Sequence, residues 1–160
     1  MPDNFVHPTH EHPFSAGAGP ENFCAGPCVV HDPASARIAA ETVVVLTRNI
    51  KTITRPIPDD PASRKAYHNA LTHYIHLKAQ QADRAKHELL TLWADYFTID
   101  HFTEFPKLSE SIWNAAQLAT EAKQEVNEET ALQLLDAVRE IHNIFWKTKG
   151  REAPWITTAV

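Results

Sequence analysis

The chain has 160 residues, of which 43% are hydrophobic and 22% are charged, and its formal net charge is -5. This length suits one domain that can bury a core without disulfides. The acidic balance argues against nucleic acid as a partner, because phosphate contacts need a surplus of Lys and Arg. No stretch reaches the roughly 20 apolar residues of a membrane span, and the first residues lack the pattern of a signal peptide. We therefore expect a cytoplasmic protein that makes no membrane contact.

Residues 1–31 differ in composition from the rest of the chain. They contain no Lys or Arg, but they hold four of the ten histidines and five prolines. Proline removes a backbone donor and restricts the residue before it, so a helix of any length is excluded here. The sequence predicts an irregular, extended, Pro/His-rich N-terminal arm.

The end of this arm, residues 24–31, reads Cys-Ala-Gly-Pro-Cys-Val-Val-His and holds both cysteines of the chain. Thiolates and imidazoles are the usual ligands of zinc, and a Gly-Pro turn can bring two sulfurs to one point. We predict a metal site with Cys24, Cys28 and His31 as ligands and His10 or His12 as the fourth. A structural zinc ion there would pin the arm to the first helix.

Three other interpretations of these cysteines stay open. They can be unligated, buried thiols, since free cysteine behaves as a small hydrophobe. They can form a short-loop disulfide under oxidising conditions. A cysteine nucleophile with a histidine base is a third alternative, although only the start of the following helix would activate the thiol.

A first helix is predicted to follow, over residues 32–57. Asp32 before Pro33 is a typical helix start. Apolar residues then recur at steps of three and four, as in one helical stripe: Ala39, Val43, Leu46, Ile50, Ile53 and Ile57. The β-branched runs at residues 42–46 and 50–54 would also suit a strand, but the stripe persists over the whole segment and favours a helix. Pro56 and Pro58 end it.

Asp60 with Pro61 repeats the start signal, and no proline or glycine follows until Pro106. The apolar positions again step by three and four, which predicts one helix of roughly 35 residues as the spine of the fold. An aromatic connector with Tyr96, Phe97, Phe102 and Phe105 should fold over one end of the core. We expect the helical tryptophans Trp93, Trp113 and Trp146 to contribute to that core.

Two shorter helices complete the pattern. One carries Leu108, Ile112, Ala115, Ala119 and Ala122 on one face, and the other starts at Asn127 and ends at Gly150. Short connections between four helices predict an all-α fold, an antiparallel four-helix bundle with one long helix. We divide the chain into the arm (1–31), the bundle (32–150) and an apolar C-terminal tail (151–160).

The long helix also carries a polar stripe. Its members share helical spacing: Asn69, His73, His76, Gln80, Asp83 and His87. His76 and His87 would lie about 16 Å apart along the axis, too far to share one ion. A solvated face is the favoured interpretation, and a surface for a protein partner is the alternative.

No phosphate-binding glycine loop, His-Glu-x-x-His motif or Gly-x-Ser-x-Gly elbow occurs in the sequence. Our leading hypothesis is therefore a non-catalytic accessory or assembly subunit. It would bind other protein chains through its arm, tail and helix faces, in a homo- or hetero-oligomer. The alternative is a small metalloenzyme with a Cys/His zinc centre in residues 24–31.

Overall fold

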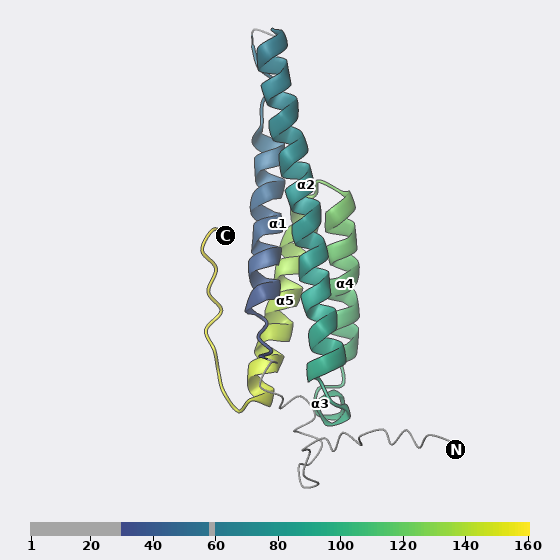
Figure 1. Ribbon diagram of the computed structural model, residues 1–160. Helices are drawn as coiled ribbons and strands as arrows, with labels where there is room; N and C mark the ends of the chain where they lie inside the picture. Colours follow the sequence, from purple (N-terminus) through teal and green to yellow (C-terminus); the bar gives the residue numbers. More distant parts are fainter. Residues whose placement is uncertain (1–29, 58–59) are drawn as a thin grey trace, which may run out of the picture. The chain divides into compact units, whose positions relative to one another are not determined.

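A computed structural model describes residues 30–57 and 60–160. The helices are α1 (Ala34–Thr52), α2 (Pro61–Thr91), the π-helical turn η2 (Leu92–Tyr96), α3 (Ile99–Glu104), α4 (Leu108–Gln124) and α5 (Glu128–Thr148) (Figure 1). These two ranges contain helices and connecting segments but no strand. The all-α fold class predicted from the sequence is confirmed.

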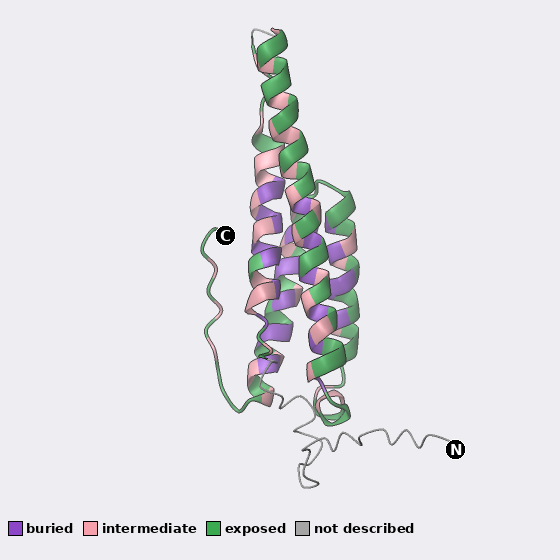
Figure 2. Cartoon of the chain, in the orientation of Figure 1, coloured by how far each residue is buried: buried purple, intermediate pink, exposed green. Residues whose placement is uncertain are grey.

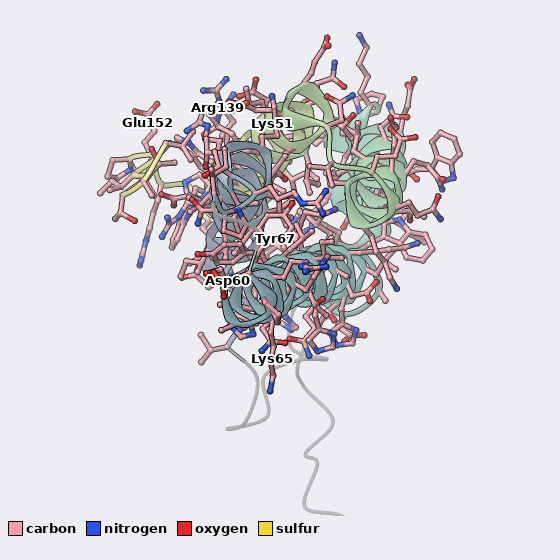
Figure 3. All side chains as sticks on the ribbon, turned by 90° about the horizontal axis from the view of Figure 1, so that it is seen from above. Lys51, Asp60, Lys65, Tyr67, Arg139 and Glu152 are labelled. Carbon is pink, nitrogen blue, oxygen red and sulfur yellow. The ribbon has the colours of Figure 1, made fainter. Side chains whose placement is uncertain are left out.

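The four long helices form a ring in which each packs against two neighbours. α1 and α4 both contact α2 and α5, and consecutive long helices run in opposite directions (Figure 1). Figure 3 looks along the bundle and shows the four helices nearly end on. This is the antiparallel four-helix bundle expected from the short connections.

The predicted helix starts are present. The Asp60 carboxylate accepts hydrogen bonds from the backbone N–H groups of Ala62 and Ser63, and the Asn127 side chain accepts from Glu129 N. Asp32 accepts from Ala34 N at 2.7 Å. These contacts satisfy N–H groups that have no partner inside the helix. Residues 34–52 form a helix, so the strand alternative for residues 42–46 is wrong, but the helix ends at Thr52 rather than at residue 57 as predicted.

The long helix continues from Pro61 to Tyr96, but its last five residues wind as a π-helical turn, with Phe97 N donating to Leu92 O at 2.9 Å. The aromatic connector that follows contains α3, which the sequence did not predict. A six-residue helix is too short to show a periodic stripe. Phe97 is buried, and Phe102 and Phe105 pack against the core, as expected for this connector.

Two tryptophans that we expected in the core lie on the surface instead. Trp93 is 46% exposed and Trp113 is 62% exposed. Each follows a buried residue, Leu92 or Ile112, and the next position on a helix points about 100° away. Trp146 does pack against the core, although it is only partly buried.

A lysine occupies one core position. Lys78 is fully buried in α2, and its Nζ donates to the carbonyl oxygens of Ala122, Lys123 and Glu125 at the end of α4. Burial lowers the pKa of Lys78. The three carbonyls would otherwise lack partners at the helix end, so this lysine fastens the end of α4 to α2.

None of the helices in the described ranges combines the length and the hydropathy needed to cross a bilayer.

Candidate metal centre

The structure describes one of the five predicted metal ligands. His10, His12, Cys24 and Cys28 lie outside the described residues, and His31 lies at the start of the described chain, just before α1. Covalent connectivity places Cys28 three residues before His31. The position of this histidine therefore marks the part of the bundle from which the cysteine-containing stretch extends.

His31 has a buried nitrogen without a protein partner. Its Nε2 is inaccessible to solvent and makes no hydrogen bond within the described chain, while its ring lies against Tyr96 at a centroid distance of 5.7 Å. Buried polar atoms nearly always have a partner, and each exception calls for an explanation. An imidazole nitrogen in this situation fits a metal ion or a group held beside one.

Around His31 lies a set of side chains that we call the foot cluster: His31, Tyr96, His101, Phe145 and Lys149. They come from the segment just before α1, from η2, from α3 and from the end of α5. The Tyr96 ring is central, since His101 stacks on it at 5.7 Å and Phe145 contacts it at 4.5 Å. Segments distant in sequence thus converge at His31, the last residue of the predicted metal-binding stretch 24–31.

The foot cluster is also polar. The Tyr96 hydroxyl shares a 2.6 Å hydrogen bond with the Thr148 hydroxyl, and the Lys149 ammonium lies 4.6 Å from the centre of the Tyr96 ring. A cation at this distance is attracted by the negative face of the ring. The ammonium therefore has a preferred position at this end of the bundle.

The polar stripe of α2 does not form a metal site. All six residues of the stripe are exposed, and Asp83 pairs with Lys123 at 2.7 Å. Across residues 30–57 and 60–160, no three His, Cys, Asp or Glu side chains are close enough to hold an ion. This agrees with the solvated face that we favoured for the stripe.

We did not predict Tyr96, His101 or Lys149 as site residues. The sequence signal available was the dense run of aromatic residues after α2, which we assigned to the core alone. The convergence of α3 and the end of α5 on Tyr96 depends on tertiary packing, and no spacing along the chain reveals it.

Comparisons with known proteins assign the family. The family described as nickel-containing superoxide dismutase matches residues 18–149. The chain is 35% identical to the nickel superoxide dismutase of Streptomyces seoulensis and 34% identical to that of Streptomyces coelicolor, in both cases over 79% of this chain and 87% of the relative. A native structure of nickel superoxide dismutase superposes with a TM-score of 0.65 at 34% identity, covering 77% of this chain and 96% of that one. An apo structure gives a TM-score of 0.66 at 32% identity, covering 76% and 99%.

These matches correct our functional predictions. The predicted metal, zinc, is wrong because the family is defined by nickel, and thiolate and imidazole donors do not by themselves separate these two metals. The non-catalytic accessory subunit and the zinc metalloenzyme are both wrong, because the relatives are nickel enzymes. The lack of acid, base and oxyanion-donor patterns does not argue against an enzyme here, because a redox metal carries that chemistry itself. The chain belongs to the nickel-containing superoxide dismutase family.

Proposed function

We propose that this protein dismutates superoxide at a nickel ion held by residues 24–31. The observation that carries the proposal is the family match, which includes this stretch together with all of the helices. Cys24 and Cys28 would supply thiolates, and His31 would supply an imidazole. His10 and His12 precede the matched residues, and the proposal does not include them.

The available donors suit nickel. Cys24 and Cys28 are the two cysteines of the chain, and imidazole and thiolate both bind late first-row metals well. The unpartnered Nε2 of His31, in the residue that ends this stretch, fits the role of a donor or a near neighbour of the ion. Thiols must lose their protons to bind a metal as thiolates, so nickel affinity should rise with pH.

Bound nickel would supply one-electron redox chemistry, accepting an electron from one superoxide and giving an electron to the next. The protein's own residues then have to admit a small anion and deliver two protons for each hydrogen peroxide formed. Lys149 provides a positive charge at the foot of the bundle, and a fixed cation attracts an anionic substrate. The Tyr96 hydroxyl, held by Thr148, is a proton-bearing group on the same side.

The partner that we propose is a second copy of this chain rather than a different subunit. Two apolar side chains are exposed in this region: Ile57 in the connection between α1 and α2, and Ile75 in the first half of α2. Exposed apolar residues often mark a contact between subunits. Light scattering of the purified protein would show a mass of more than one chain. A cytoplasmic location stays a prediction.

The experiment that tests the function compares three preparations: protein loaded with nickel, protein loaded with zinc, and nickel-treated Cys24→Ser. We expect superoxide consumption in the first alone, and loss of bound nickel in the variant as measured by elemental analysis. His31→Gln separates two roles for the histidine. Loss of nickel would make it a ligand, and retained nickel with reduced activity would place it beside the ion. Equal activity of the zinc and nickel forms would refute the proposal.

A further inference from the structure

The C-terminal tail, residues 151–160, lies beyond residue 149, where the family match ends. It leaves α5 after Gly150, whose φ of 64° ends the helix in a left-handed conformation. The tail then runs back beside α1 as an extended segment (Figure 1). Two sets of contacts hold it against the bundle.

The first contact is made by Glu41 in the second turn of α1. Its Oε1 accepts hydrogen bonds from the backbone N–H groups of Thr158 and Ala159, both at 2.5 Å, and from the Thr158 hydroxyl at 3.2 Å. Its Oε2 pairs with Arg37 at 3.3 Å. Glu41 is only 5% exposed, and a buried carboxylate is costly unless such donors surround it. The tail supplies three of these four donors.

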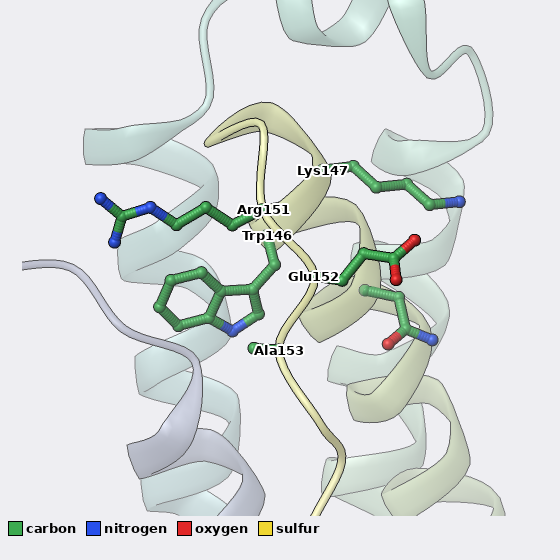
Figure 4. A pocket seen from close by; sticks show the side chains of 6 residues that line it. Trp146, Lys147, Arg151, Glu152 and Ala153 are labelled. Carbon is green, nitrogen blue, oxygen red and sulfur yellow. The ribbon is translucent and has the colours of Figure 1, made fainter.

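The second contact lies at the end of α5. The Trp155 ring meets His142 edge to face at 5.2 Å, and His142 Nε2 lies 3.4 Å from the carbonyl oxygen of Ala153. The first residues of the tail, with Trp146 and its neighbours on α5, line an open hollow of about 230 Å³ (Figure 4). Trp155 itself packs against the core.

These two contacts connect the first turns of α1 to the last turns of α5. The first turns of α1 are the part of the bundle to which residues 24–31 are directly joined. Helix ends open locally more easily than helix centres. A segment fastened across them raises the free energy of that opening. Because metal binding is coupled to folding, we expect opening at the start of α1 to speed the loss of a metal held by the residues joined to it.

We infer that the tail is a strap that positions the nickel-binding stretch by fixing the start of α1. Glu41 holds the strap in place by accepting its hydrogen bonds. This inference rests on the proposed function for the nickel itself. It assigns to Glu41 and Trp155 a positioning role in retaining the metal. Neither residue is assigned as a ligand.

The test uses the full-length nickel protein, a chain ending at Gly150, and Glu41→Gln. Ile156→Ala is the matched control, because this tail residue is 59% exposed and makes neither contact. Hydrogen exchange of residues 34–45, the rate of nickel loss to excess chelator, and the melting temperature are measured for each. We expect both test variants to speed exchange in residues 34–45 and to speed nickel loss by about tenfold, as for the loss of a set of charge-assisted hydrogen bonds. In both test variants, exchange in α4 should match that of the parent protein. Ile156→Ala should match the parent in exchange, nickel loss and melting temperature.

Unchanged exchange and nickel loss in both test variants would overturn the strap while leaving the proposed function intact. Faster exchange throughout α4 would also overturn it, because the tail would then stabilise the whole bundle rather than the start of α1. A parent protein that binds no nickel would instead refute the proposed function, and the positioning role with it.

Discussion

The two halves of the bundle differ in how they are built. In the half that contains the foot cluster, four helices surround a core of buried apolar side chains, whereas the far half consists of the end of α1 and the beginning of α2 alone (Figures 1 and 2). The buried residues of α2 start at Lys78, and those of α1 end at Thr47. His31, the last residue of the predicted metal-binding stretch 24–31, lies in the half with the packed core, where side chains have little freedom to move.

The difference shows where rigidity is needed. Functional sites need side chains held in one geometry, and side chains in a packed core have less freedom to move than those on a two-helix hairpin. The far hairpin has only half-buried apolar residues, such as Leu71 and Tyr74, so its stability depends on fewer contacts. Changes in the packed half should therefore be the more damaging.

Truncation of one side chain in each half tests this contrast and should give the largest effect. Phe145→Ala removes a buried ring that contacts Tyr96, and such changes cost about 3–5 kcal/mol of unfolding free energy. Leu71→Ala, at a half-buried position, should cost about 1 kcal/mol. Urea unfolding measures both. Equal losses would contradict the division of the bundle.

Lys78 lies at the boundary between the halves and should give the second largest effect. Lys78→Met leaves the carbonyls of Ala122, Lys123 and Glu125 without their donor, which should cost about 2 kcal/mol. Lys86→Met is the control, because within residues 30–57 and 60–160 Lys86 donates to one acceptor, the Thr120 hydroxyl. A smaller loss for Lys78→Met than for Lys86→Met would show that the carbonyls find water instead.

Acidification should weaken the packed half through His142. Burial lowers the pKa of this histidine, which is 6% exposed. The unfolded chain therefore takes up the proton first, and stability is lost as the pH falls below the ordinary histidine value of about 6.5. Thermal melts at a series of pH values would show this slope in the parent and a weaker slope in His142→Gln. An identical slope in both would exclude His142 as its source.

The smallest effect is expected at the ion pairs between α1 and α5. Glu128 accepts from Arg48 Nε at 2.8 Å and from Lys51 Nζ at 3.0 Å, and Lys51 is labelled in Figure 3. The hydrogen bonds from Arg48 and Lys51 lower the pKa of Glu128. Their contribution is present above the ordinary glutamate pKa and is lost as the pH falls through the lowered value. Lys51→Ala should change the melting temperature slightly, and added salt should remove the difference. A salt-independent loss would point to packing instead.

The sequence predicted the helices well because their starts are marked by local chemistry. Asp60 with Pro61, and Asn127, are capping residues whose effect does not depend on tertiary contacts. The prediction that Trp93 and Trp113 lie in the core was wrong, because the hydrophobic character of a residue does not decide which face of a helix is covered. The short α3 and the π-helical turn depend on packing at the foot of the bundle and leave no periodic pattern.

The metal site was predicted only in part. Cys24, Cys28 and His31 were recognised as donors from residue type and spacing, and they stay a prediction. The choice of zinc failed because the same donors serve several metals, and the selection between these metals depends on coordination geometry and supply. The sequence did not predict an enzyme, because in this family the metal, rather than a recognisable set of side chains, carries the one-electron chemistry. The surrounding chain then lacks the acid, base and nucleophile patterns by which enzymes are usually recognised.

X-ray absorption at the nickel edge tests the central claim most directly, because it reports the atoms bound to the metal. We predict sulfur ligands on nickel in the parent protein, fewer sulfur ligands in Cys28→Ser, and superoxide dismutation that disappears with them. Nickel bound only through nitrogen and oxygen, with activity unchanged in Cys28→Ser, would contradict the assignment of residues 24–31 as the metal centre.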